Sequence, residues 1–223
     1  MARHAALERR LGHRFRDPAL LEQALTHRSY GAPHYERLEF LGDCVLCCAV
    51  AQQLFLKFPG LSEGKLTRAR SSLVRESSLA GVARELGLAK FLRLGDAASL
   101  DEGAERPSIL ADALEAVFGA VFLDAGYEAA RGAIVRSYGE ALERIDPEAV
   151  PKDPKTRLQE HLQGARRAMP HYRLVGTHGP RQRLTFEVEC VLGDLHLAAT
   201  GSGTSRQRAE QQAAAKLLEQ LRA

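Results

Sequence analysis

The chain has 223 residues, of which 45% are hydrophobic and 26% are charged, and its formal net charge is +3. This composition is typical of a globular protein and excludes a disordered chain, a collagen and a coiled coil. The length suffices for one large domain or two small ones. We expect no membrane span, because the nearest candidate, residues 109–123, contains Asp112 and Glu115. The N-terminus lacks the apolar core of a secretory signal, and the four cysteines, two of them adjacent at 47 and 48, do not suggest a disulfide framework, so we expect reduced thiols and a cytoplasmic location.

The charge is divided unevenly along the chain. Residues 1–150 contain 19 Lys and Arg against 21 Asp and Glu, a net charge of −2. Residues 151–223 contain 12 against 7, a net charge of +5. The basic segment is either a chance variation or a separate module that binds a polyanion, and composition alone leaves both open.

The first 145 residues predict a series of helices. Asp17 is suited to cap a helix that begins at Pro18. Apolar residues recur at helical spacing, and cap and stop residues bound each run. The predicted helices are 18–26, 35–57, 63–75, 76–86, 108–125 (with Ser108 as cap) and 128–144. Residues 95–107 are small and charged, with two Gly and one Pro, and predict a loop.

The pattern changes after a segment with three prolines at residues 146–154. We therefore predict a linker at 147–152 between a first domain, 1–146, and a second domain, 153–223. Asp153 and Ser205 are predicted helix caps. Residues between the two helices alternate with the period of strands. The predicted elements are helix 154–167, strands 171–178, 184–192 and 195–201 with a turn at Gly193-Asp194, and helix 206–221. This α-β-β-β-α order predicts an antiparallel sheet with both helices on one face.

Two predicted helices of the first domain carry carboxylates that share a face. Glu36, Glu39 and Asp43 are spaced i, i+3 and i+7 and fall within about 60° of one another around the helix. Asp112 and Glu115 are spaced i, i+3 in an otherwise apolar run. A carboxylate in such surroundings requires a proton, a cationic partner or a metal ion.

The acids have two interpretations. Oxygen ligands without histidine suit Mg²⁺ or Mn²⁺, and several carboxylates holding such ions suit the hydrolysis of phosphodiesters. Alternatively, the acids form buried ion pairs with Arg37, Arg68 or Arg70. Spacing alone leaves both open.

Residues 36–43, Glu-Arg-Leu-Glu-Phe-Leu-Gly-Asp, are similar to the signature of the ribonuclease III family. Further segments that resemble the family are 26–29 (Thr-His-Arg-Ser), 63–68, 70–74 and 106–116. The last 70 residues resemble the double-stranded RNA-binding domain that bacterial members carry. The resemblance covers almost the whole chain.

The resemblance implies an all-α endonuclease domain followed by a small α+β double-stranded RNA-binding domain. It further implies a homodimer that cuts both strands of double-stranded RNA with Mg²⁺, for which Mn²⁺ can substitute. The products carry 5′-phosphate and 3′-hydroxyl ends with short 3′ overhangs, and the substrates include precursors of ribosomal RNA and structured messenger RNAs. The implied metal ligands are Glu39, Asp112 and Glu115, the implied catalytic acids are Asp43 and Glu115, and Glu36 is an implied RNA contact. For Phe40 and Leu41 two expectations remain open, a contact between protomers or a position in the core.

The second domain carries the other implied RNA contacts. They are Thr156, Gln159 and Glu160 in the first helix, Gln182 in the loop after Gly179-Pro180, and Ser205, Arg206 and Arg208 at the last helix. Arg206 and Arg208 could instead form a solvated helix face. Four features depart from the family pattern. Gln182 stands where a His is usual, Gln207 where a basic residue is usual, and Cys44 where a Ser is commoner, and the loop at 95–98 differs. We expect Cys44 to be buried.

Two rival functions remain at this stage. One is an RNA-binding regulator that does not cleave. The other is a metal-dependent phosphohydrolase of small nucleotides with an unrelated basic tail. A cleavage assay on duplex RNA with and without Mg²⁺ separates the first rival from a nuclease, and loss of duplex binding on deleting residues 152–223 argues against the second.

Overall fold

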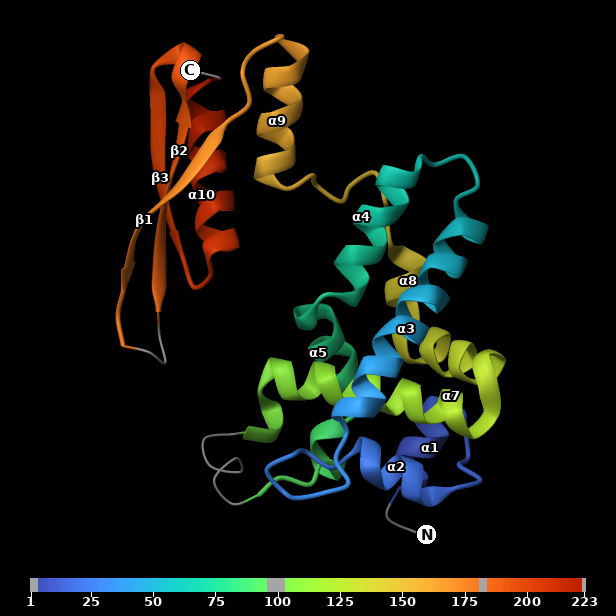
Figure 1. Cartoon of the computed structure of the whole chain (residues 1–223). Coiled ribbons are helices and arrows are strands. Elements are labelled where there is room, and N and C mark those ends of the chain that lie inside the picture. Colours follow the sequence, from blue (N-terminus) through green and yellow to red (C-terminus); the bar gives the residue numbers. More distant parts are fainter. Residues whose placement is uncertain (1–3, 96–102, 181–183, 222–223) are drawn as a thin grey trace. The chain divides into compact units, whose positions relative to one another are not determined.

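The computed structural model describes residues 4–95, 103–180 and 184–221. The chain divides into two compact units, Met1–Val150 and Pro151–Ala223, and each is described by itself (Figure 1). Most of the predicted 95–107 loop and the predicted RNA contact Gln182 lie outside the described residues.

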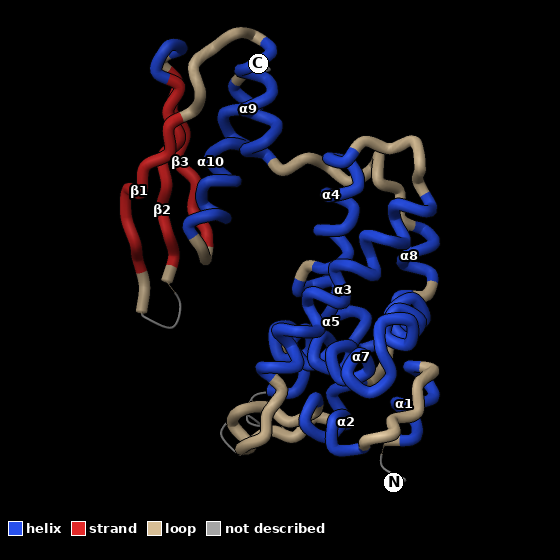
Figure 2. Tube along the Cα trace, turned by 45° about the vertical axis from the view of Figure 1, so that its right-hand side comes forward, coloured by secondary structure: helices blue, strands red, loops and turns tan. Residues whose placement is uncertain are grey.

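The described part of the first unit is built from helices (Figure 2). They are α1 (Ala5–Leu11), α2 (Pro18–Ala24), α3 (Glu36–Lys57), α4 (Glu63–Val74), α5 (Glu76–Glu85), α7 (Pro107–Tyr138) and α8 (Glu140–Arg144), with short 3₁₀ turns η1 (Leu88–Phe91) and η2 (Gly103–Glu105). The side chains of Leu46, Leu114 and Phe118 are fully buried in its core. The expected helical class of this unit is confirmed.

Helices α3 and α7 cross with their backbones in close approach. A Cβ atom on Gly42 would lie 1.8 Å from the carbonyl oxygen of Glu115, and one on Gly119 would lie 2.3 Å from that of Leu38. Only glycine permits two backbones to approach so closely. The crossing therefore sets where the side chains of the two helices meet.

Three helix predictions differ from the structure. The helix predicted to start after Ser108 begins at Pro107, where the ring presets the helical φ and the missing N–H costs nothing. The non-helical residue Gly126 (φ +81°) kinks α7, so the predicted break between helices at 108–125 and 128–144 is confirmed, but the second helical part ends at Tyr138 rather than at residue 144. Helix α1 was not predicted, because seven residues make about two turns and show little periodicity.

The helix closest to a membrane span is α3 rather than residues 109–123. Its 22 residues include a window of mean hydropathy 1.4, which is long and apolar enough to cross a membrane by length and composition. A core helix passes the same test. One face of α3, including Leu46 and Leu54, is buried in the first unit, and Glu36, Glu39 and Asp43 lie on another.

The second unit has the predicted α-β-β-β-α order. Its elements are α9 (Pro154–Gly164), β1 (His171–His178), β2 (Thr185–Leu192), β3 (Leu197–Gly203) and α10 (Arg206–Gln220). The sheet is antiparallel in the order β1-β2-β3, and both helices pack on one face through a core that includes Leu158, Cys190 and Leu217. This fold class is confirmed.

The predicted caps and turn of the second unit have mixed outcomes. The Asp153 carboxylate accepts a hydrogen bond from the Thr156 amide at 3.0 Å, and the Ser205 hydroxyl accepts one from the Arg208 amide at 3.2 Å, as expected for N-caps. Helix α9 ends at Gly164, three residues earlier than predicted. The turn at Gly193 is a 3₁₀ turn, η3 (Gly193–Leu195), rather than a two-residue hairpin loop.

Candidate active site

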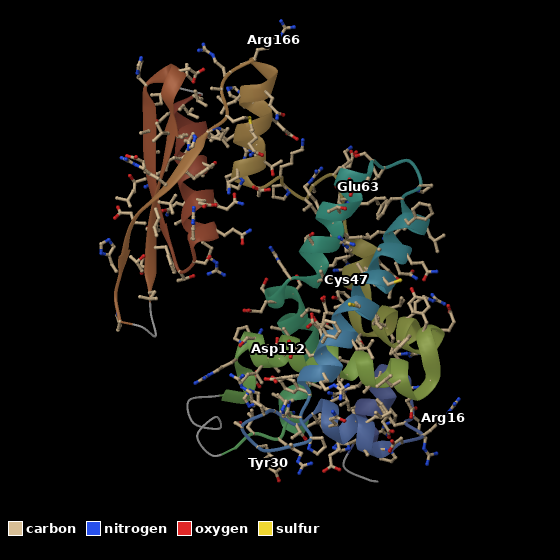
Figure 3. The ribbon with its side chains drawn as sticks, viewed as in Figure 1. Arg16, Tyr30, Cys47, Glu63, Asp112 and Arg166 are labelled. Carbon is tan, nitrogen blue, oxygen red and sulfur yellow. The ribbon has the colours of Figure 1, made fainter. Side chains whose placement is uncertain are left out.

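Three acids from α3 and α7 converge at the helix crossing. Glu39, Asp112 and Glu115 each offer a carboxylate oxygen, and these oxygens lie within 4.8 Å of one another. Asp112 lies in the first half of α7 (Figure 3). Glu39 is one turn before Gly42, so the close approach of the two backbones brings its side chain to those of α7.

The electrostatics of this cluster favour a bound cation. Burial, followed by the charges of Asp43 and Asp112, raises the pKa of Glu115 to about 8. Burial and neighbouring carboxylates also raise the pKa values of Glu39 and Asp112. Among the described residues, no Lys or Arg lies within 4.0 Å of the carboxylates of these acids, so the ion-pair alternative is wrong there. All-oxygen donors of high negative charge fit a hard divalent metal ion.

The two other acids of the α3 stripe lie outside the three-oxygen cluster. Asp43 is exposed, and its carboxylate accepts a hydrogen bond from the Cys47 thiol at 3.4 Å. Glu36 accepts a hydrogen bond from Arg28 at 3.3 Å. Cys44 is exposed rather than buried, because it lies on the solvent side of α3. All four cysteines are free, as expected.

A cavity lies against the cluster. Its volume is about 420 Å³, and it is lined by His27, Arg28, Tyr35, Glu36, Glu39, Ser108, Ile109 and Asp112. His27, Arg28 and Tyr35 were not among the predicted site residues, and Ser108 was predicted only as a helix cap. For His27 and Arg28 the signal was the Thr-His-Arg-Ser segment at 26–29, which resembles the family but contains no acid. The cavity thus places hydrogen-bond donors opposite the carboxylates.

The implied RNA contacts of the second unit that the structure describes lie on α9 and at the start of α10. On α9, the Thr156 hydroxyl donates to Asp153 at 2.6 Å, Gln159 is half-buried, and Glu160 pairs with Lys152 at 2.6 Å. At the start of α10, Arg206 pairs with Glu210 at 3.1 Å.

Arg208 is the freer of the two arginines at the start of α10. It is exposed, and its guanidinium donates to the Thr204 hydroxyl at 3.1 Å. The pairing of Phe186 with Gly203 and of Thr185 with His178 places the start of α10 and the loop after β1 at one end of the sheet.

A helical unit with an unpaired carboxylate cluster, joined to a basic α-β-β-β-α unit, defines a metal-dependent nuclease that acts on RNA. Comparison with known families agrees. Residues 17–142 match the family model described as Ribonuclease-III-like, and residues 154–221 match the double-stranded RNA binding motif. The chain belongs to the ribonuclease III family and is an endoribonuclease for double-stranded RNA.

The relatives span nearly the whole chain. It is 55% identical to "Ribonuclease 3" of Bordetella avium, covering 96% of this chain and 86% of the relative. It is 54% identical to "Ribonuclease 3" of Aromatoleum aromaticum, covering 97% and 96%. The solved nuclease domain of ribonuclease III from Campylobacter jejuni is 43% identical, with a TM-score of 0.62, and covers 66% of this chain and 100% of that domain. A second structure of that domain has a TM-score of 0.61 at 43% identity and covers 64% of this chain and 99% of that domain. It concerns structural flexibility in the region of that domain involved in dimer formation.

Proposed function

We propose that the chain hydrolyses both strands of double-stranded RNA with Mg²⁺ held by Glu39, Asp112 and Glu115, and that Mn²⁺ can replace Mg²⁺. The observation that carries this proposal is the convergence of three carboxylates from two helices, within 4.8 Å, without a cationic side chain beside them in the described residues. The small, hard ion suits all-oxygen ligands.

Each acid has a proposed part in the reaction. When bound, the metal ion supplies a Lewis acid that activates water and neutralises charge on the phosphoryl group. Glu39, Asp112 and Glu115 hold the ion. Its binding is favourable because the positive charge relieves the repulsion that the ionised Glu115 experiences from neighbouring carboxylates. Asp43 is exposed beside the cluster, where its carboxylate accepts hydrogen bonds from water and orients it. The products carry 5′-phosphate and 3′-hydroxyl ends.

A second copy of the chain completes the proposed enzyme. Phe40 on α3 is 78% exposed and Leu123 on α7 is 54% exposed. Both line a groove of about 610 Å³ with Leu20 and Leu41. Exposed apolar side chains of this size at a groove are typical of a protein interface. We assign the groove to the partner protomer, so that two active sites cut the two strands and leave a short 3′ overhang.

The second unit is proposed to grip the duplex through phosphates and 2′-hydroxyls. Its net charge of +5 and the exposed Arg208 at a helix N-terminus support this role. We expect Arg208→Ala to lower the slope of log affinity against log salt by about 1, because one phosphate contact is lost. Gln207→Ala, at the next position on the same helix, is the matched control and should leave the slope unchanged. An unchanged slope for Arg208→Ala would remove Arg208 from the interface.

The proposed setting is the cytoplasm, where four free cysteines are stable. The proposed substrates are structured precursors of ribosomal and transfer RNA and structured messenger RNAs. Their common feature is an A-form helix, which proteins recognise by shape rather than by base sequence.

Cleavage of a perfect RNA duplex tests the active-site proposal. The native chain, Glu115→Gln and Glu128→Gln are compared with Mg²⁺ and with a chelator. Glu128 lies on the same helix but is 72% exposed and paired with Arg131, so its variant is the control. We expect Mg²⁺-dependent cleavage by the native chain and the control, and a loss of at least about 1,000-fold for Glu115→Gln. Full activity of Glu115→Gln, or ends without a 5′-phosphate, would overturn the proposal.

A further inference from the structure

The imidazole of His27 lies in the cavity that holds Glu39 and Asp112, yet no step so far uses it. Its Nδ1 atom is 3.1 Å from the backbone nitrogen of Ser29 and 2.7 Å from the Ser29 hydroxyl. A backbone N–H can only donate, so Nδ1 must accept. In the neutral ring the proton therefore sits on Nε2.

The Ser29 hydroxyl is itself held in place. It accepts a hydrogen bond from the Gly95 amide at 3.0 Å, which leaves its own hydrogen for His27 Nδ1. Gly95 approaches so closely that a Cβ atom there would lie 2.2 Å from the Ser29 carbonyl oxygen. The chain of donors from Gly95 through Ser29 to His27 thus selects one tautomer.

The ring of His27 is also fixed in orientation. Its backbone amide donates to the Arg93 carbonyl at 3.0 Å, and its ring packs edge-on against Tyr35 with 5.6 Å between centroids. Burial and the neighbouring Arg28 lower the pKa of the imidazole, which keeps it neutral and preserves Nδ1 as an acceptor. Two bonded anchors and a packed ring are the arrangement of a preorganised donor.

The Nε2–H group has no hydrogen-bond acceptor among the residues that the structure describes. The Arg28 guanidinium in the same cavity is already bonded to Glu36. An uncommitted neutral donor beside a proposed metal site suits the phosphate and ribose oxygens of RNA, which are acceptors.

We propose that His27 donates a hydrogen bond from Nε2 to a backbone oxygen of the RNA strand at the cleavage site. Ser29 and the Gly95 amide act through it as positioning groups. The inference rests on the proposed function, since it requires the RNA backbone to enter the cavity beside the metal ligands. The proposed contact comes from the connection between α2 and α3, whereas the proposed metal ligands come from α3 and α7.

Two amide substitutions separate this contact from a structural role. The side-chain amide of Gln reaches the place of Nε2 and keeps a donor in the cavity. That of Asn reaches only the place of Nδ1, where its oxygen still accepts from Ser29. A contact with RNA therefore predicts that His27→Gln is the more active variant, whereas a purely structural role predicts that His27→Asn is.

The experiment uses the full chain and a perfect RNA duplex under single-turnover conditions with Mg²⁺. We expect His27→Asn to lower the saturating cleavage rate by about 10-fold or more, with its thermal midpoint near that of the native chain. His27→Gln should stay within about 3-fold of the native rate. His34→Gln, which removes a nearby imidazole outside the cavity lining, is the matched control.

A second readout does not depend on cleavage. Crosslinking of duplex RNA to the first unit in a chelator should fall in His27→Asn and persist in His27→Gln. Equal rates for the two variants, or a better His27→Asn, would overturn the inference while Glu115→Gln is inactive and the proposed function stands. An active Glu115→Gln would instead overturn the proposed function itself.

Discussion

Glu115 shows, at the scale of a single residue, how an active site works against stability. Burial and three nearby carboxylates raise the pKa of its side chain to about 8. Without a metal ion, the protein therefore holds an acid whose charged form is disfavoured where it sits. The proposed role as a metal ligand gives a reason for an acid at this position, which folding does not.

We predict that Glu115→Gln stabilises the metal-free protein while it abolishes cleavage. The amide keeps the shape of the side chain and is neutral without taking up a proton, so the cost of burying or protonating a carboxylate beside Asp43 and Asp112 disappears. The free energy of unfolding should rise by about 1 kcal/mol. Thermal unfolding in a chelator at pH 7.5 measures the effect.

Glu128→Gln provides the reference for this stability measurement. Its side chain is exposed, so the free energy of unfolding should change by less than about 0.5 kcal/mol. A Glu115→Gln variant less stable than the native metal-free chain would contradict the account of the cluster as repulsive.

At the scale of elements, the crossing of α3 and α7 assembles the site. We predict that Gly42→Ala destabilises the first unit by about 2–4 kcal/mol, because its methyl group would meet the backbone of Glu115 at 1.8 Å. Cleavage should fall as well, since separating the helices moves Glu39 away from Asp112. Denaturant unfolding and a cleavage assay give the two effects.

Gly132→Ala is the control for helix propensity. Gly132 lies on α7, and no atom is within 4 Å of the position its Cβ would take. Alanine there should stabilise the chain by about 0.5–1 kcal/mol. If both glycine variants behave alike, close packing at Gly42 is not the cause.

The joint between α9 and α10 gives the second unit a pH-dependent stability. The Lys155 ammonium donates to the Glu210 carboxylate at 2.6 Å, and this hydrogen bond, helped by Arg206, lowers the pKa of Glu210 below its ordinary 4.5. A lowered pKa in the folded state stabilises the fold above about pH 4.5. The stabilisation is lost as the pH falls through the folded-state pKa.

We therefore predict that Glu210→Gln is less stable than the native chain above pH 5, and that the difference shrinks below pH 4.5. Unfolding of the second unit, followed through its own amide NMR signals from pH 3 to 7, measures the difference. Glu219→Gln, an exposed position on the same helix, corrects for general effects of charge. A gap between native and Glu210→Gln chains that persists to pH 3 would rule out the ion pair as its source.

At the scale of the whole molecule, the protein is a homodimer with two units in each chain. We predict that Phe40→Ala weakens the dimer by about 2–4 kcal/mol, roughly 30- to 1,000-fold in dissociation constant, because an exposed aromatic ring is a typical interface anchor. Sedimentation at several protein concentrations measures the dissociation constant.

Met169→Ala is the control for this measurement, since Met169 is an exposed apolar side chain of the second unit. Its dimer should be as tight as that of the native chain. The folded protomer should survive Phe40→Ala, because the ring is exposed rather than part of the core. A Phe40→Ala chain that remains as dimeric as the native one would move the interface elsewhere.

The order of elements and the candidate acids followed from the sequence. Glu39 and Asp43 on one helix and Asp112 and Glu115 on another were paired by helical spacing, a local property of the backbone. The strands of the second unit and the caps Asp153 and Ser205 were local in the same sense. Similarity to the ribonuclease III signature then linked the two helices to one site.

Other features could not be predicted from the local sequence pattern. The exposure of Asp43 and Cys44 depends on which face of α3 its neighbours cover. The end of α7 at Tyr138 and the separate helix α8 that follows Gly139 were also not predicted. The part of His27 in the cavity depends on Ser29 and on Gly95, which is 68 positions further along the chain.

The sequence by itself determined two modules of opposite charge, the period of each element and the acids available for a metal. Only the tertiary structure decided that three of those acids meet within 4.8 Å without a cationic partner among the described residues. The physical reason is the distance over which each kind of information acts. Periodicity reports neighbours within one helix or strand, whereas the meeting of Glu39 with Asp112 and Glu115 depends on Gly42 and Gly119 letting two distant backbones touch.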